Sequence, residues 1–378
     1  MSRPTVLHVI TGLDDGGAEA VLYGLVTADP GHVHIVVSLM GPGKYGPLLG
    51  DAGVTVHALG MSRGRLSLRS CHRLWTLVRS SGAIVVQTWM YHADLVGGIV
   101  ARLAGKRAVI WGLHNAFLGP REARVIVHAC ARLSRLVPRR IISCSDRAAR
   151  LHASLGYASE RLRVIPNGYD LSRFRHDERA RHRLRSEWGV GPEGIALGMV
   201  ARWSPEKDHA NLAEALGQLA AETNLEWRLI LVGTSMVASN AALVGLLERF
   251  GLRQRTCLLG PQRAIAEVMS ALDLHILSSA AEAFPNVVAE AMACETPCVV
   301  TDVGDAGLIV GDTGWVVPNK DASRLAQGIE RALHAKSDTQ GWADRRRAAR
   351  ERIATHFSLA RMVRSYSEVW HEAASGGK

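Results

Sequence analysis

Short apolar runs alternate with longer amphipathic segments along the whole chain. The runs have the length and the branched side chains of buried strands at residues 5–10, 34–38, 54–59, 83–88, 108–113 and 140–145. Segments with helical spacing of apolar positions separate them, at residues 18–28, 70–80, 94–104, 121–136 and 146–155. This alternation predicts a doubly wound parallel sheet, whose ligands bind at the carboxyl ends of the strands.

The alternation resumes after a charged interval, residues 172–193, that has no strand pattern. Further strands are predicted at residues 195–201, 227–233, 257–260, 274–277, 299–301 and 314–317, and helices at residues 209–221, 322–335, 344–356 and 359–374. A chain of 378 residues fits two ordinary domains better than one. We therefore expect two α/β domains, at residues 1–175 and 190–358, with a boundary near residues 170–190.

The most informative stretch follows the strand predicted at residues 274–277. Small and polar residues form a loop that contains Glu282, and Pro285 suits the first turn of a helix because it has no N–H to leave unpaired. Glu290 lies in that helix, eight residues after Glu282. A helix N-terminus attracts phosphate, and carboxylates accept hydrogen bonds from hydroxyls. The stretch therefore suits a ligand with hydroxyls and phosphate, such as a nucleotide sugar.

The sequence from Glu282 to Cys294, EAFPNVVAEAMAC, resembles the E-x7-E motif of retaining glycosyltransferases of family 4, which have the GT-B fold. Ala283 and Glu295 depart from the family pattern, in which glycine is common at both positions. The resemblance implies that Glu290 binds the ribose hydroxyls of a nucleotide sugar and that Glu282 binds hydroxyls of the transferred sugar. The implied donor site also includes Phe284, Pro285, Asn286 and Val287.

Two cations follow the strand predicted at residues 195–201. The sequence RWSPEKD, residues 202–208, resembles the G-R-x-x-x-x-K-D loop of family 4. Arg202 offers a forked guanidinium to phosphate oxygens, and Lys207 offers a point charge. Because negative charge builds on a departing diphosphate, two cations there favour cleavage of the glycosidic bond. We therefore predict that Arg202 and Lys207 act with Glu282 in catalysis and in donor binding.

Two features of the first half also follow predicted strands. Gly16 and Gly17 lie in a glycine-rich turn, where backbone can approach a phosphate closely. They resemble the G-G-A-E loop of family 4, which implies that they face the donor pyrophosphate or the acceptor.

His114 resembles the histidine that many family 4 enzymes place near the transferred sugar, and an ordinary structural histidine is the alternative. The segment IPNGYD, residues 165–170, resembles the interdomain crossing of the family.

Charge is unevenly distributed: residues 1–170 contain 20 Lys and Arg against 10 Asp and Glu, and the remainder contains 25 of each. Arginines interleave with apolar residues from Arg63 to Arg79 and from Phe117 to Arg140, which predicts two amphipathic helices with cationic faces. Such helices can lie on an anionic membrane surface. The alternatives are an Arg-rich composition and core-packed helices with a solvated outer face.

Other function classes are disfavoured. The chain has no D-x-D or H-E-x-x-H pattern, so we expect neither a metal nor another cofactor. No nucleic-acid recognition motif is present, and aromatic residues make up only 5%. The six cysteines form no C-x-x-C pair, which favours a reducing cytoplasm, and no apolar run could span a bilayer. The absence of G-x-G-x-x-G disfavours an NAD-dependent oxidoreductase.

The resemblance implies a GT-B fold: two Rossmann-like domains facing a cleft, with the last helix, residues 359–378, returning to the first domain. The first domain would bind the acceptor and the second the donor. We predict a metal-independent retaining glycosyltransferase that moves a hexose or N-acetylhexosamine, from UDP by prevalence, to a saccharide acceptor. A lipid-linked acceptor for surface polysaccharide, at the cytoplasmic membrane face, is expected. Alternatives are a nucleotide-sugar epimerase or phosphorylase on the same fold, and a non-catalytic binding protein.

Overall fold

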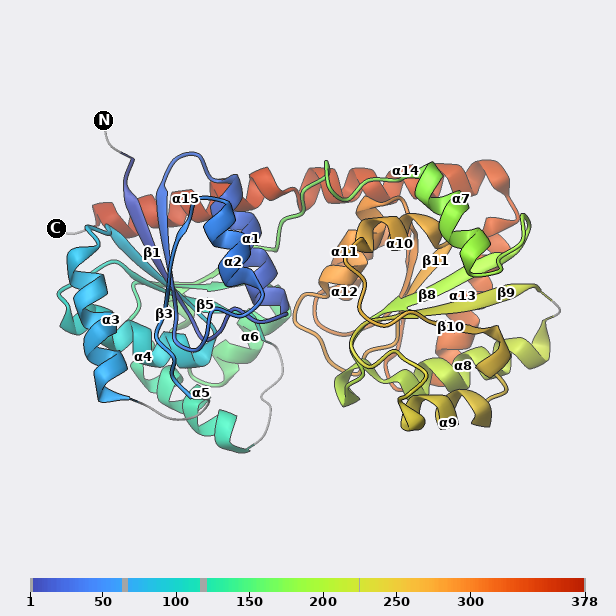
Figure 1. The fold of residues 1–378 in the computed structure, drawn as a ribbon, viewed down its shortest axis with the longest axis horizontal. Coiled ribbons are helices and arrows are strands. Elements are labelled where there is room, and N and C mark those ends of the chain that lie inside the picture. The colour runs from blue at the N-terminus through green and yellow to red at the C-terminus, as the bar shows by residue number, and fades with distance from the viewer. Residues whose placement is uncertain (1–2, 63–66, 116–120, 224, 377–378) are drawn as a thin grey trace. The chain divides into compact units, whose positions relative to one another are not determined.

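Two compact units make up the structure, a computed structural model that describes residues 3–62, 67–115, 121–223 and 225–376 (Figure 1). The first unit is Met1–Gly168 together with Leu359–Lys378, and the second is Tyr169–Ser358. The division falls just before the predicted boundary, because the charged interval forms a helix of the second unit, α7 (Glu178–Glu187).

A parallel sheet forms the centre of the first unit, with the strand order β3-β2-β1-β4-β5-β6-β7. Its strands are β1 (Thr5–Ile10), β2 (Val33–Ser38), β3 (Thr55–Ala58), β4 (Val85–Trp89), β5 (Val109–Leu113), β6 (Arg140–Ser143) and β7 (Leu162–Val164). Strand order reverses between β1 and β4, whose carboxyl ends pair Ile10 with Trp89. Alternate residues of β1 face opposite cores, with Val6 and Ile10 in one and Leu7 and Val9 in the other.

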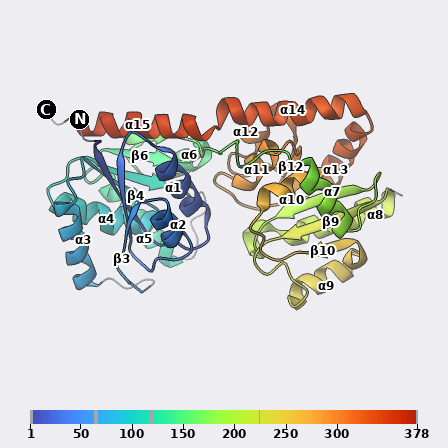
Figure 2. The same cartoon turned by 45° about the horizontal axis from the view of Figure 1, so that its top comes forward.

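Helices cover both faces of this sheet. They are α1 (Gly17–Ala28), α2 (Tyr45–Asp51), α3 (Leu68–Ser80), α4 (Tyr91–Leu103), α5 (Arg121–Leu133), α6 (Asp146–Ser154) and α15 (Leu359–Ser375), with the 3-10 turn η1 (Ser159–Arg161). The last helix, α15, packs beside α1 and contributes Met362, Tyr366 and Trp370 to the core (Figure 2). This placement agrees with the expectation that the C-terminal helix returns to the first domain.

The second unit repeats the architecture, with the parallel strand order β10-β9-β8-β11-β12-β13. Its strands are β8 (Ile195–Val200), β9 (Trp227–Val232), β10 (Thr256–Leu258), β11 (Leu274–Leu277), β12 (Cys298–Thr301) and β13 (Trp315–Val317). Beside α7, its helices are α8 (His209–Glu222), α9 (Ala241–Arg249), α10 (Ile265–Ala271), α11 (Asn286–Ala293), α12 (Ala306–Val310), α13 (Ala322–Lys336) and α14 (Thr339–His356), with the 3-10 turns η2 (Pro205–Lys207), η3 (Arg253–Arg255) and η4 (Gly311–Thr313). Two doubly wound α/β units confirm the predicted fold class.

Most of the predicted elements are present, and the missed ones are short or polar. The helices that pattern analysis did not identify are α2, α7, α9, α10 and α12, and the missed strand is β7. Side-chain caps begin several helices, as expected from Ser, Asp and Asn at these positions. The capping residues are Ser67, Ser145, Asp177, Asp208, Asn240, Asp321 and Asp338.

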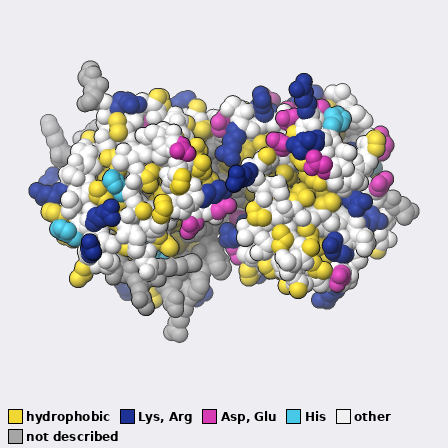
Figure 3. All heavy atoms as spheres, viewed as in Figure 1, with side chains coloured by type: hydrophobic (Ala, Val, Ile, Leu, Met, Phe, Trp, Pro, Cys, Tyr) yellow, Lys and Arg dark blue, Asp and Glu magenta, His cyan; other side chains and the backbone are white. Residues whose placement is uncertain are grey.

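The apolar faces of the two basic segments pack in the core of the first unit. In α3, Leu74 and Val78 are buried, and in α5, Val127 and Cys130 are buried. The predicted residues Arg63, Arg65 and Phe117 lie outside the described residues. In the second unit, basic and acidic side chains intersperse on the face shown in Figure 3.

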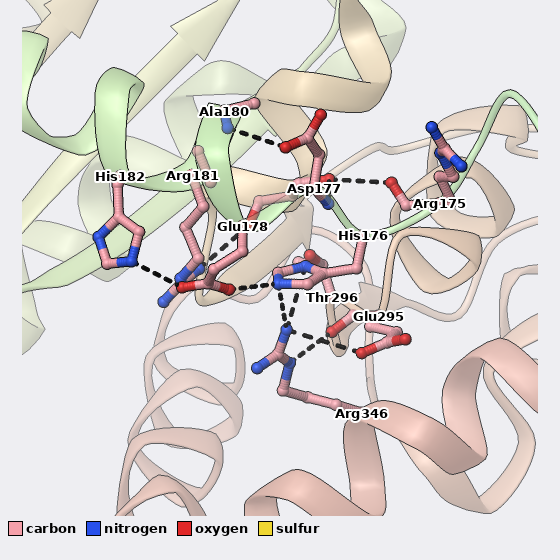
Figure 4. Close-up of polar contacts among 12 residues, drawn as sticks. Arg175, His176, Asp177, Glu178, Ala180, Arg181, His182, Glu295, Thr296 and Arg346 are labelled. Carbon is pink, nitrogen blue, oxygen red and sulfur yellow. Dashed lines mark hydrogen bonds and ion pairs between the residues drawn. The ribbon is translucent and has the colours of Figure 1, made fainter.

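Glu295, which departs from the glycine of family 4, lies just after α11 in the left-handed region, with φ of 62°. Arg346 of α14 donates from Nε to the Glu295 carbonyl at 3.1 Å and lies 3.7 Å from its carboxylate (Figure 4). The same guanidinium lies 3.1 Å from His176 Nδ1. The side chain therefore adds an ion pair to a strained backbone position that suits glycine.

Glu295→Gly is expected to leave the free energy of unfolding unchanged or to raise it by up to ~1 kcal/mol, because relief of backbone strain offsets loss of a half-exposed ion pair. Glu295→Ala loses the ion pair and keeps the strain, so it should be less stable than both. Urea unfolding of the three proteins measures the order. An alanine variant as stable as the glycine variant would show that the strain at φ of 62° is negligible.

Candidate active site

The loops after β8 and β11 meet because these strands are neighbours where the strand order reverses. The backbone N–H of Ala280 donates to the carbonyl of Glu206 at 2.8 Å. The hydroxyl of Ser278 donates to the carbonyls of Lys207 and Asp208, at 3.0 and 3.1 Å. The loop that contains Glu282 therefore rests directly on the turn that contains Lys207.

Lys207 and Glu282, which are 75 residues apart, form an ion pair in this structure. Lys207 Nζ donates to Glu282 Oε1 at 2.5 Å, and the Ser279 hydroxyl donates to the same oxygen at 2.7 Å. Both side chains are largely buried, with 16% of Lys207 and 12% of Glu282 exposed. Because each side chain is held by a partner, their charged ends have fixed positions at the strand ends.

Arg202 lies on the same loop as Lys207 and is much more exposed. Its guanidinium pairs with Glu206, and 60% of its side chain is accessible. Glu206 has no role in the predicted site, and its contact with Arg202 was not foreseen. The two predicted cations therefore differ: Lys207 is held inside the site, and Arg202 extends from its rim.

Two glycines allow the loops of this site to approach closely. Gly233, which follows β9, has φ of 139°, and a Cβ there would lie 2.2 Å from the carbonyl oxygen of Ala201. Gly304, which follows β12, has φ of 52°, and its Cβ would lie 2.3 Å from the carbonyl oxygen of Ala283. The N–H of the next residue, Asp305, donates to the same Ala283 oxygen at 3.0 Å. Side chains at either glycine would separate the loops.

Helix α11 begins one residue later than predicted, since Pro285 is its N-cap rather than a residue of its first turn. Phe284 is 6% exposed and packs its ring 5.7 Å from that of Phe357. The amide oxygen of Asn286 accepts a hydrogen bond from the Tyr169 hydroxyl at 2.6 Å. Tyr169 belongs to the IPNGYD segment, whose sequence gave no sign of a contact with Asn286 of the E-x7-E motif. The neighbouring Val287 is half-buried.

Glu290 lies within α11, and burial raises the pKa of its carboxyl to about 7, although the charge of Arg173 opposes the shift. The carboxyl is therefore divided between its two protonation states near neutral pH. A neutral carboxyl donates and accepts hydrogen bonds, whereas a carboxylate only accepts them. Any hydroxyl ligand of Glu290 thus meets a group whose charge depends on pH.

Two buried histidines near Lys207 were not identified from the sequence. Burial, together with the Lys207 charge, lowers the pKa of His275 to about 3 and that of His209 to about 4, although the Glu206 charge opposes the shift of His209. Both rings are neutral at pH 7, and Lys207 is the charged member of this group. His275 lies within the apolar pattern of β11, which gave no signal of its position beside the cation.

In the first unit, His114 follows β5 and stacks on Trp89, with ring centres 4.9 Å apart and planes inclined by 17°. Burial lowers the pKa of His114 to about 4, so its ring is neutral at pH 7. Asp94 of α4, which the sequence analysis gave no role, joins the ends of β4 and β5. Its Oδ1 accepts from the Thr88 hydroxyl at 2.5 Å and from the N–H of Gly112 at 3.2 Å.

Gly16 and Gly17 begin α1, Gly16 as the N-cap in an extended conformation. A Cβ at Gly16 would lie 2.3 Å from the Glu19 carboxylate. Glu19 is therefore folded against the helix start, as a glutamate at this position does in a capping box. The glycine at position 16 makes room for this carboxylate. A contact of either glycine with a ligand stays a prediction.

Within the described ranges, no group of three or more His, Cys, Asp and Glu side chains is arranged to hold a metal ion. In the same ranges, no helix combines the length and the apolar composition needed to cross a membrane.

Two families match the chain, one for each half. Residues 194–335 match the family "Glycosyl transferases group 1", and residues 15–173 match "Glycosyltransferase Family 4". The putative glycosyltransferase EpsF of Bacillus subtilis is 26% identical over 323 residues, 80% of each chain. The D-inositol 3-phosphate glycosyltransferase of Mycobacterium marinum is 32% identical over 224 residues, which are 57% of this chain and 46% of that enzyme. The match thus spans about half the length of the latter relative.

Solved structures share the fold. The crystal structure of Anabaena HepE in complex with UDP and glucose superposes with a TM-score of 0.85 at 23% identity, covering 98% of this chain and all of that one. Sucrose-phosphate synthase from Thermosynechococcus elongatus superposes with a TM-score of 0.79 at 19% identity, covering 97% and 98%. At these identities the likeness concerns the fold of two Rossmann-like domains, the GT-B architecture.

Proposed function

We propose that this chain transfers a sugar from a nucleotide sugar to a saccharide acceptor with retention of configuration. It carries two glycosyltransferase domains, of the family 4 type at residues 15–173 and of the group 1 type at residues 194–335. The observation that carries the proposal is the buried contact of Lys207 with Glu282, at 2.5 Å, where the strand order of the second unit reverses. An ammonium and a carboxylate side by side suit a diphosphate joined to a polyhydroxylated ring.

The roles of the side chains follow from their chemistry. Lys207 and Arg202 neutralise the departing diphosphate, and the start of α11 adds its dipole. Glu282 accepts hydrogen bonds from hydroxyls of the transferred sugar, Glu290 accepts them from the ribose, and His114 contacts the sugar. The donor site includes Phe284, Pro285, Asn286 and Val287, with Gly16 and Gly17 contributing from the first unit.

The proposed reaction needs no nucleophile from the protein and no metal. The bond between the anomeric carbon and the diphosphate oxygen breaks, and the acceptor hydroxyl forms its new bond on the same face of the sugar. The departing phosphate oxygen accepts the proton of that hydroxyl, and the products are the glycoside and a nucleoside diphosphate. Preorganised cations at the diphosphate lower the barrier because the charge that they meet develops in the transition state.

The donor is proposed to be a UDP-linked hexose or N-acetylhexosamine. The structure of HepE holds UDP and glucose, which supports the choice of nucleotide. Thermal unfolding with UDP-, GDP- and ADP-sugars tests it: a ligand at about 100 times its Kd adds ~2.7 kcal/mol to the free energy of unfolding. UDP-glucose should stabilise the chain and release UDP on incubation with acceptor mixtures. Stabilisation by NADH without any by nucleotide sugars would instead support an oxidoreductase.

The ribose contact of Glu290 predicts a pH dependence of UDP binding. With a pKa of about 7, the carboxyl loses its proton as the pH rises from 6 to 8, and the carboxylate is the stronger acceptor for hydroxyls. UDP affinity should therefore rise by a factor of up to about ten per pH unit below that pKa and then level off. Glu290→Gln should remove this rise.

Calorimetric titrations of both proteins with UDP measure the effect. The second ionisation of the phosphate, near pH 6, affects both proteins equally. The ratio of their affinities at each pH therefore isolates Glu290. If the ratio of the two UDP affinities stays constant between pH 6 and pH 8, Glu290 does not bind the ribose.

We propose a lipid-linked saccharide acceptor for surface polysaccharide synthesis, reached from the cytoplasmic face of the membrane. The support is α5 and the turn after it, which expose apolar side chains beside arginines: Val125 of the helix and Leu136 of the turn are 69% and 70% exposed, and Arg124 and Arg132 of the helix are also exposed. Anionic lipid attracts basic surfaces by about 1 kcal/mol per cation.

Sedimentation with phosphatidylglycerol vesicles tests this contact. The unaltered chain should sediment with the vesicles, and the double variant Arg124→Glu with Arg132→Glu should stay largely in solution, because two positive charges become negative at one surface, a net change of four units. Arg324→Glu with Arg331→Glu on α13 provides a control of equal charge in the second unit. Equal sedimentation of all three proteins would show that α5 is not the surface that binds the membrane.

A further inference from the structure

Buried polar side chains form a row on the face of the first sheet that α1 and α15 cover. Trp89 Nε1 donates to His8 Nδ1 at 3.2 Å. The other ring nitrogen of His8, Nε2, lies 3.0 Å from His34 Nδ1. His34 Nε2 in turn lies 3.2 Å from Asp29 Oδ2. The row thus extends from the end of β4, through β1 and β2, to the loop before β2.

The two ends of this row fix the protons in its middle. An indole N–H can only donate, so His8 Nδ1 accepts and the proton of the neutral ring lies on Nε2. His8 therefore donates to His34 Nδ1, which places the His34 proton on Nε2, toward the Asp29 carboxylate. A carboxylate can only accept, which agrees with this direction, although the 3.2 Å contact of His34 Nε2 with Asp29 Oδ2 is an ion-pair distance without hydrogen-bond alignment.

Burial and charge keep this state in place at neutral pH. His8 is fully buried, and burial, reinforced by His34, lowers its pKa well below the usual value, although the Asp29 charge opposes the shift. Burial alone would raise the pKa of Asp29, but hydrogen bonds from His34, from the N–H of Gly31 and from His32 lower it to about 2. The row therefore consists of neutral rings that end at an ionised carboxylate.

The row ends at Trp89, the residue on which His114 stacks. Trp89 also stacks on Tyr366 of α15, with ring centres 5.9 Å apart and planes inclined by 11°. Stacking alone fixes no polar atom of the indole. The hydrogen bond from Nε1 to His8 adds a directional contact that ties this fully buried indole to β1.

We propose that the row from Asp29 through His34 and His8 to Trp89 is a positioning relay that orients His114. None of the four residues needs to touch a substrate. The significance of the relay for catalysis rests on the proposed function, in which His114 contacts the transferred sugar. A displacement of about 1 Å at such a contact can cost up to about 10² in rate. Such a role accounts for the polar rings of His34, His8 and Trp89 on a face of the sheet that apolar side chains could fill.

The chain offers a matched set of variants. His8→Phe keeps an aromatic ring but removes both hydrogen bonds of the relay. His8→Gln keeps one acceptor and one donor and can restore both. His32→Phe is the control, because His32 is equally buried and donates from Nδ1 to Asp29 Oδ2 at 2.8 Å, but it branches from the row and does not lie between Asp29 and Trp89.

The primary measurement needs no substrate. Long-range 1H–15N spectra of the chain labelled with 15N-histidine report the protonated nitrogen of each ring, and single His variants assign the signals. The unaltered chain should show His8 and His34 protonated on Nε2 and His32 on Nδ1. The His114 signals should shift in His8→Phe and remain in place in His8→Gln and His32→Phe.

Two results would overturn the relay: an Nδ1 proton on His8 in the unaltered chain, which needs no variant to fold, or His114 signals that do not respond to His8→Phe. Turnover is the second readout. UDP release from UDP-glucose should show a kcat lowered about tenfold or more in His8→Phe, recovered in His8→Gln, at unchanged KM. If the unaltered chain releases no UDP, the proposed donor fails, and the spectra still decide the relay.

Discussion

Lys207→Ala is expected to lower kcat by a factor on the order of 10² or more, because removal of one preorganised contact to a developing charge typically costs that much. The structure makes Lys207 a stronger candidate than Arg202 for this effect. Its ammonium is largely buried and held at 2.5 Å by Glu282, so it needs little reorganisation when charge develops. Arg202→Ala, at the exposed rim, should therefore cost less.

The same substitution has a cost in stability that must be separated from catalysis. Without Lys207, the Glu282 carboxylate loses its cation and keeps the Ser279 hydroxyl as its donor, a loss of about 1–3 kcal/mol. Thermal unfolding and UDP binding must therefore be measured beside kcat. Lys336→Ala, at the end of α13, is the control lysine and should leave kcat unchanged. A folded Lys207→Ala protein with near-normal kcat would exclude Lys207 from the mechanism.

Asp273→Ala is expected to lower the free energy of unfolding by about 3–5 kcal/mol, as loss of one partner from a buried ion pair does. Asp273 is 4% exposed. Its two oxygens accept from Arg181 at 2.6 Å, from Arg185 at 2.7 Å and from the N–H of Ala196 at 2.8 Å. Its removal leaves two guanidinium groups of α7 without their carboxylate.

A matched control also involves an arginine of α7. Arg183 of α7 also pairs with Glu267 of α10, but both side chains are about half exposed, so Glu267→Ala should cost less than about 1 kcal/mol. Urea unfolding of both variants measures the contrast. Similar losses in the two variants would show that burial of Asp273 does not determine its contribution.

Acidification provides an independent check on Asp273. Burial would raise the pKa of its carboxyl, but the charges of Arg181 and Arg185 and the N–H of Ala196 lower it below the usual value. The contribution of ionised Asp273 to the free energy of unfolding is therefore complete above the ordinary aspartate pKa. It is lost as the pH falls through the lower pKa of the folded state. The unaltered chain should lose this contribution below about pH 4, and Asp273→Ala should not.

Periodicity alone was sufficient to identify the architecture. Runs such as Leu274–Leu277 have the length of buried strands rather than of helices, and their alternation with amphipathic segments favours parallel crossovers. The predicted bounds failed where the pattern is polar. Helix α7, with its charged sequence ERARHRLRSE, has no apolar stripe, because it buries arginine against Asp273 rather than hydrocarbon. A pattern of apolar positions cannot reveal such a helix.

Motif spacing identified the side chains of the candidate site but not their mutual contacts. Arg202, Lys207, Glu282 and Glu290 were each recognisable because particular residues follow particular strands. Nothing local indicated that Lys207 would meet Glu282 rather than a nearer carboxylate such as Glu206. That choice depends on the strand order, which makes β8 and β11 neighbours although the chain visits β9 and β10 between them.

The amino-acid sequence by itself thus determined which residues form strands and helices and which side chains follow each strand, because both depend on near neighbours in the chain. Tertiary structure alone decided which of those side chains meet. It placed Lys207 against Glu282, made His275 a neutral neighbour of a cation, and linked Trp89 to His8 across two strands. The physical reason is that burial and hydrogen bonding between distant segments, which set these charges and tautomers, exist only after the sheet has formed.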